Sequence, residues 1–288
     1  MRRLEAGSTE LRPAATPRLP LSLPSRALYL LRLYGKYLEL YARQLLAYRM
    51  DTLVACVAGV AIQASGFAFA GIVLQRLPVL NGWHFFEVVF IYGFVTTVTS
   101  VCSTFLNAPF MLQPAIRHGE FDILLVRPVG PLFQLVGQSQ QPNAIMSMFT
   151  GGAIVAYALA HVDVRWGAVH IAMVVPLVGS AVGIRFAVHM IVATLSFWTD
   201  VSSVMYPVSW LYDFMRYPLE IFHPIVRATV TFAIPYAFAS FYPAAYLLRP
   251  QQYPWAVVGV PAVAGVTLLA AGVFWRQALQ HYESVGAA

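Results

Sequence analysis

Apolar segments of membrane-spanning length occupy much of this 288-residue chain and constrain its fold more than any short motif does. A helix needs about 20 apolar residues to cross the hydrocarbon core of a bilayer. Runs of that kind cover residues 52–74, 86–106, 144–162, 167–198 and 255–275. Because backbone polar groups in lipid must be hydrogen-bonded internally, these runs predict an all-α integral membrane protein.

The composition excludes several classes of protein. Hydrophobic residues make up 59% of the chain and charged residues only 10%, whereas a soluble domain carries about 25% charged residues. Cys56 and Cys102 lie in apolar runs, which argues against a disulfide framework or a zinc site. The signature motifs of zinc proteases, serine hydrolases and nucleotide-binding loops are missing from the sequence. We therefore expect no catalytic, cofactor-binding or metal site, and no nucleic-acid partner.

The N-terminal region divides into two parts. Residues 1–25 are rich in arginine and proline, and we expect a disordered cytoplasmic leader. Residues 26–50 are expected to form an amphipathic helix, with Ser25 as its N-cap. One face carries charged side chains, and the opposite face carries leucines and tyrosines, which suits the bilayer interface; the charged residues are Arg32, Lys36, Glu39 and Arg43.

The orientation follows from basic residues near the first apolar run. Nine of the 18 lysines and arginines precede residue 50, and basic flanks remain in the cytoplasm. We expect a six-span transmembrane domain at residues 51–278, with a cytoplasmic tail at 279–288. The fifth span is either 201–216, capped by Asp200, or 226–247. In the first case, the proline-rich segment 218–248 forms re-entrant helices on the outer face before the last span.

Two features of the later runs lead to further expectations. The run 167–198 would reach roughly 48 Å as one helix, so it must project beyond the lipid or bend, with Pro176 as the candidate site. Trp255 and Trp275 stand 20 residues apart and are expected to mark the two interfaces of the last span.

Arg185 and His189 lie one helical turn apart inside an apolar run. A charge near the bilayer centre costs about 2.5–3.5 kcal/mol on insertion scales. One interpretation places this pair on a translocation path or a subunit interface. In the other interpretation, the two side chains snorkel towards the lipid boundary, or this part of the helix projects beyond the lipid.

The segment from Gln113 to Pro128 mixes charged and apolar residues between the second and third runs. Gly119 interrupts its helical pattern, and Pro128 ends the part that follows. A short amphipathic element that faces the cytosol can dock on a soluble partner. A solvated loop with some interfacial anchoring is the alternative.

A set of short segments is shared with a known family, and these are residues 48–51, 117–122, 125–128, 131–134, 196–198, 217–222, 234–235, 242–244 and 282–284 with Gly286. In their order and spacing they resemble the membrane permease subunits of the ATP-binding cassette (ABC) transporters, type-2 export superfamily. The resemblance is greatest to a branch of uncharacterised bacterial permeases and extends over about residues 28–286.

This resemblance implies a non-catalytic, multi-pass subunit of an exporter in the bacterial inner membrane, with both termini cytoplasmic. A second permease subunit, identical or related, would pair with it. A dimer of cytosolic ATPase subunits would bind ATP and Mg²⁺. Residues 112–128 would form the coupling helix seated on that ATPase, and the residues implied in the contact are Arg117, Gly119, Glu120, Asp122, Arg127 and Pro128.

Two other classes of function compete with this interpretation. A secondary transporter or channel that works without an ATPase would need acidic ion sites within its spans. An intramembrane enzyme would need acids, histidines or a serine–lysine pair there. Most carboxylates of this chain lie at the ends of the apolar runs or between them, which favours the permease.

Overall fold

The computed structural model describes residues 23–76, 79–164 and 166–282. The expected leader lies outside the described residues up to position 22, and the expected tail does so from position 283. Helix α1 runs Leu23–Ala47. Ser25 lies inside α1, so its prediction as the N-cap is wrong. Proline is tolerated in the first turn because its missing N–H would have no helical partner there, and the helix therefore begins before Pro24.

Most of the described chain is helical, and the long helices follow the apolar runs. Their bounds are α2 Arg49–Arg76, α3 Phe85–Phe105, α7 Pro142–Leu159, α8 Ala168–Thr194, α9 Ser202–Phe214 and α13 Ala256–Gln280. Three short helices lie between α3 and α7, where the amphipathic segment was expected: α4 Ala108–Arg117, α5 Glu120–Leu125 and α6 Pro131–Gln138.

The chain between α9 and α13 forms short elements. They are the 3-10 helix η2 Leu219–Ile221, α10 Pro224–Ala228, the π-helix η3 Thr229–Ala233, α11 Tyr236–Ala239 and α12 Phe241–Leu248. Pro218, Pro224 and Pro235 stand at or just before the starts of three of these elements. The alternative fifth span at 226–247 is therefore divided among four elements and is not one continuous helix.

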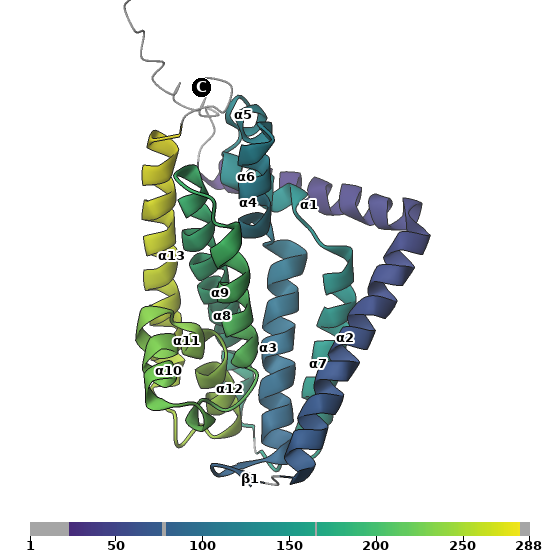
Figure 1. Ribbon diagram of the computed structural model, residues 1–288, viewed down its shortest axis with the longest axis vertical. Helices are drawn as coiled ribbons and strands as arrows, with labels where there is room; N and C mark the ends of the chain where they lie inside the picture. Colours follow the sequence, from purple (N-terminus) through teal and green to yellow (C-terminus); the bar gives the residue numbers. More distant parts are fainter. Residues whose placement is uncertain (1–22, 77–78, 165, 283–288) are drawn as a thin grey trace, which may run out of the picture.

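The long helices form a bundle with two distinct ends (Figure 1). Helices α2, α3, α7, α8, α9 and α13 run along its long axis. Helix α1 lies across one end next to α6, and α4, α5 and the C-terminal end of α13 lie at the same end; we call this the α5 end. Helices α10, α11 and α12 and the strand β1 lie towards the other end, which we call the hairpin end.

Within the described residues, four helices are long and apolar enough to cross a membrane. They cover Arg49–Ala68, Phe85–Arg117, Ala168–Phe197 and Ala256–Gln280, and a shorter apolar helix covers Ala144–Leu159. Helix α9 has 13 residues, fewer than a span ordinarily needs. The expectation of an all-α, multi-pass membrane protein is confirmed, while length and composition alone support four spans.

Helix α8 is continuous across Pro176 and ends in the 3-10 turn η1, Leu195–Phe197. Helices α3 and α7 pack closely along their lengths, and small residues permit this contact. A Cβ atom built on Gly93 would lie 2.9 Å from the backbone nitrogen of Val155, and one on Gly151 would lie 2.8 Å from Thr97 Oγ1. Close helix approach through small residues is common in membrane bundles.

A two-stranded hairpin, which the sequence analysis did not anticipate, precedes α3. Strand β1, Val79–Leu80, pairs antiparallel with β2, Trp83–His84. Asn81 and Gly82 between them have φ values of 48° and 87°. Two positive φ values define the type I′ turn that an Asn-Gly pair favours, so the dipeptide was the signal in the sequence.

Candidate functional site

The segment expected to dock on a partner is a helix–turn–helix at the α5 end. Helix α4 ends at Arg117, and Gly119 adopts a left-handed conformation with φ 71° before α5 begins. Glycine ends helices in this conformation because it has no Cβ to clash with the backbone. Helix α5 ends at Leu125, before Pro128. The predicted interruptions at Gly119 and Pro128 are both confirmed.

Helix α5 has one face buried in the protein and one face exposed. Phe121 and Leu124 point into a hydrophobic core that α4, α6, α8 and α13 share. Ile123 is 54% exposed and Val126 is 79% exposed. The exposed members of the predicted set are Arg117, Glu120, Arg127 and Pro128. The α5 end therefore exposes a small apolar patch, Ile123 and Val126, together with charged side chains from the same segment.

Arg117 contacts the start of α9 through Asp200. Its guanidinium and the Gln113 side-chain amide both donate to the Asp200 carboxylate. The N-cap position of α9 is Val201, so the predicted N-cap position at Asp200 is wrong by one residue. The ion pair is about half exposed, so its contribution to stability is small. It does place α4 next to the beginning of α9.

Gln134 joins α5 to α6. Its side chain is almost completely buried and donates to the carbonyl oxygens of Leu124, at 3.0 Å, and Val129, at 2.5 Å. Arg127 Nη1 donates to Gln134 Oε1 over 3.4 Å. These bonds fix the turn that carries Pro128. The sequence analysis included Gln134 only as a member of the family pattern, because its two acceptors are backbone groups that no side-chain motif announces.

Arg185 and His189 lie inside the bundle, 7% and 1% exposed. Snorkelling to the lipid boundary is therefore not what the structure shows. His189 Nε2 lies 3.0 Å from the Ser209 hydroxyl of α9, and the Arg185 guanidinium lies 5.1 Å from the centre of the Tyr212 ring. In the described part of the chain, no carboxylate pairs with Arg185, and its Nε has no hydrogen-bond partner.

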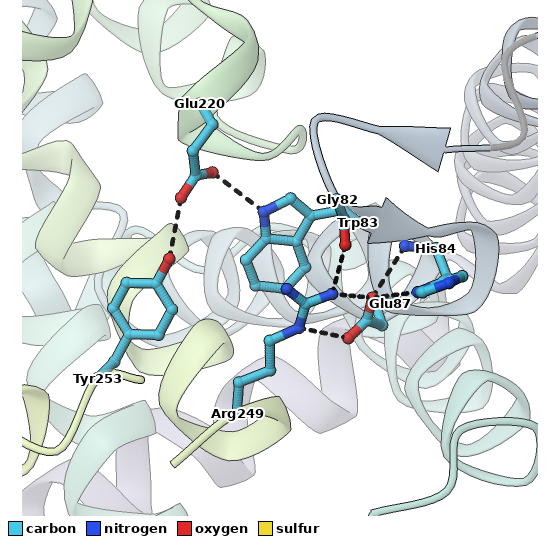
Figure 2. A network of polar contacts seen from close by, with 7 residues as sticks. All are labelled: Gly82, Trp83, His84, Glu87, Glu220, Arg249 and Tyr253. Carbon is cyan, nitrogen blue, oxygen red and sulfur yellow. Dashed lines mark hydrogen bonds and ion pairs between the residues drawn. The ribbon is translucent and has the colours of Figure 1, made fainter. Parts of the chain in front are cut away.

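A second polar network, which sequence reasoning missed, lies at the hairpin end (Figure 2). Arg249 donates to both oxygens of Glu87, at 2.7 and 2.5 Å, and its guanidinium lies 4.1 Å from the centre of the Trp83 ring. Glu220 accepts from Trp83 Nε1 and from the Tyr253 hydroxyl, at 3.1 and 2.9 Å. The network therefore joins the hairpin, α3, η2 and the loop before α13.

Partial burial affects the protonation of Tyr253 in this network. Burial raises the pKa of the Tyr253 hydroxyl above its usual range, and the hydrogen bond to Glu220 raises it further. Tyr253 therefore remains a donor at neutral pH. Most partners here lie more than 100 residues apart in the chain, so no local pattern could have revealed them. Among the described residues, no group of three His, Cys, Asp or Glu side chains could hold a metal ion.

A bundle of helices that are long and apolar enough to cross a membrane is the architecture of a multi-pass membrane protein. A family model described as ABC-2 family transporter protein matches residues 60–286, which is most of the chain. The chain therefore belongs to the ABC-2 family of transporter proteins, whose members are permeases of ABC-type transport, and the predicted resemblance is confirmed. No match was found among curated proteins or among solved structures.

Proposed function

We propose that this chain is the non-catalytic transmembrane half of an ABC exporter, and that α4 and α5 form its coupling element. ATP and Mg²⁺ would bind to a partner ATPase dimer in the cytosol. A second permease subunit, identical or related, would complete the translocation path. The observation that carries this proposal is the exposure of Ile123 and Val126, in a segment with exposed charged residues, at one end of an ABC-2 permease.

The proposed topology in the inner membrane has six crossings and cytoplasmic termini. Four spanning helices and α7 supply five of them, and α9, which runs along the same bundle axis (Figure 1), supplies the sixth. The α5 end then faces the cytosol, and the short helices α10–α12 form the re-entrant segment on the outer side. Basic residues on and after α1 support this orientation.

The coupling element suits a soluble partner because its exposed face combines apolar and charged side chains. Apolar side chains at the centre of an interface lose water on binding, while charged side chains at the rim select the partner. Arg117, Glu120 and Arg127 would supply that rim, Asp122 would orient α5, and Gly119 and Pro128 would set its angle. Closure of the ATPase dimer would move this element and shift the permease between two packings of similar free energy.

Arg185 and His189 are proposed to line the translocation path or the contact between the two permease subunits. Burying a guanidinium without a carboxylate partner costs folding free energy, and the presence of Arg185 at such a position among the described residues favours a role in transport. Replacement of Arg185 by leucine should change the transport rate without lowering membrane insertion. An unchanged rate would exclude this role.

Exposed-face variants of α5 test the proposed coupling. In the double variant Ile123→Asp, Val126→Asp, two carboxylates replace the apolar centre, and co-purification of an ATPase subunit from mild detergent should be lost. Gln138→Asp is the matched control, because Gln138 is exposed at the same end of the bundle but lies outside the patch. Normal co-purification and ATP-dependent transport in the double variant would contradict the proposal.

A further inference from the structure

The buried face of α5 contacts the C-terminal end of the last span. The Phe121 ring is met edge-on by the rings of Phe197, Trp275 and Tyr282, with centroids 5.4, 6.1 and 5.0 Å away. These rings come from η1, from α13 and from the residue two positions after α13. Trp275 is only 7% exposed, so its ring packs against the protein, and its expected level at the membrane interface stays a prediction.

A hydrogen bond supplements this ring packing. The Tyr282 hydroxyl donates to Asp122 Oδ1 over 2.9 Å. Burial raises the pKa of the Tyr282 hydroxyl above its usual range, and the bond to Asp122 raises it further. Tyr282 therefore remains protonated, and remains a donor, throughout the neutral and mildly alkaline range. Hydrogen bonds to charged acceptors are roughly twice as strong as those between neutral groups.

Helix α5 needs such external support because it has only six residues. Isolated helices shorter than about 12 residues are marginal in water, so packing must set the angle of α5. Gln134 fixes the C-terminal end of α5 to α6. The contacts of Phe121 and Asp122 fix its middle to the end of α13.

We infer that Tyr282 is a positioning residue that fixes α5 to α13, so that movement of the coupling element is transmitted directly to the last span. Helix α13 packs along α8, and Phe197 connects the same ring cluster to the end of α8. Arg117 and Asp200 link the coupling element to α9 in the same way. The element is thus attached to the α8, α9 and α13 side of the bundle. The role of the Tyr282 contacts in transport rests on the proposed function, whereas their role in positioning α5 does not.

A distance measurement on the purified chain tests the inference without any ATPase. Spin labels at Ile123→Cys on α5 and Val258→Cys on α13 would report the position of α5 by pulsed electron paramagnetic resonance. Both sites are exposed, and Val258 lies about 25 Å along α13 from Trp275. Cys56 and Cys102 would be replaced by alanine, and the labelled chain would be diluted with unlabelled chain in lipid nanodiscs.

We expect one narrow distance peak with Tyr282 present and its loss in Tyr282→Phe, which removes only the hydroxyl group. Asp122→Ala should have the same effect, whereas Asp122→Asn should retain the peak, because the amide oxygen still accepts the bond. Tyr253→Phe is the matched control: it loses an equivalent tyrosine–carboxylate bond, to Glu220, at the hairpin end, and should leave the peak unchanged.

A narrow peak in both Tyr282→Phe and Asp122→Ala would overturn the inference, because it would show that the hydrogen bond does not position α5. Loss of the peak in Tyr282→Ala would then assign the position of α5 to ring packing alone. Failure of the proposed ATPase docking would appear instead in the separate co-purification test, as normal co-purification of the double variant Ile123→Asp, Val126→Asp, and would leave the distance results unchanged.

Discussion

At the scale of single residues, the geometry of the α5 end depends on a glycine with an unusual backbone and on a few buried polar side chains. Gly119 has a positive φ and open space where a Cβ would lie, so its importance is conformational and not steric. Gln134, by contrast, acts through two hydrogen bonds to backbone carbonyls. The turn between α4 and α5 and the contact of α5 with α6 therefore depend on residues that do not themselves form the exposed patch.

Gly119→Ala should destabilise the turn by about 1–2 kcal/mol, the cost of the left-handed conformation for a residue with a Cβ. The result expected is lower stimulation of the partner ATPase, with a small decrease in melting temperature. Gly130→Ala is the control, because Gly130 has a negative φ of −54° and equally open space around its Cβ position. Equal effects of the two variants would show that the backbone conformation of Gly119 is not what matters.

Gln134→Met should loosen the contact between α5 and α6, because it leaves two carbonyl groups without their donor. An unsatisfied buried polar group costs about 1–3 kcal/mol. We expect faster amide hydrogen exchange in α5, measured by mass spectrometry, with unchanged exchange at the hairpin end. Unchanged exchange in α5 would refute the assigned role of Gln134.

At the scale of elements, close contacts and ion pairs hold the bundle together at positions far from the coupling element. The contact of α3 with α7 depends on glycines, and the hairpin end depends on the pairing of Glu87 with Arg249. Each has an exposed counterpart elsewhere in the chain, so a variant at the buried position can be compared with the same substitution at the exposed one. In both cases the expected cost follows from burial and not from the type of residue.

Gly151→Ala should destabilise the α3–α7 contact by about 1–3 kcal/mol, the usual cost of overpacking, since its Cβ would lie 3.0 Å from the backbone nitrogen of Thr97. The neighbouring Gly152 has nothing within 4 Å of its Cβ position, so Gly152→Ala should be neutral or slightly stabilising. Thermal unfolding in detergent measures both variants. Similar melting temperatures for the two would contradict the packing described here.

Glu87→Gln should destabilise the hairpin end by on the order of 2 kcal/mol, the lower part of the range for loss of one partner of a buried ion pair. The side chains of Glu87 and Arg249 are 10% and 22% exposed. Glu39→Gln, which breaks the exposed pairs with Lys36 and Arg43, should leave the melting temperature unchanged. The account of the hairpin end fails if Glu87→Gln melts no lower than Glu39→Gln.

At the scale of the whole molecule, the sequence predicted what repeats locally and missed what pairs over long distances. The apolar runs gave the positions of the long helices, and Gly119 and Pro128 gave the breaks around α5. The pairs Glu87–Arg249 and Asp122–Tyr282 stand 162 and 160 positions apart. They form only when the helices pack, so spacing carries no sign of them. The same reason explains the contact of Asp200 with Arg117, which stands 83 positions away.

The central claim is that the α5 end faces the cytosol and contacts an ATPase through Ile123 and Val126. The most direct test is cysteine crosslinking in native membranes, with Cys56 and Cys102 replaced by alanine. A single cysteine at Ile123 should crosslink to an ATPase subunit, while one at Ile225, exposed in α10 near the hairpin end, should not. Crosslinking from Ile225 and not from Ile123 would place the coupling surface at the wrong end of the bundle and contradict the account.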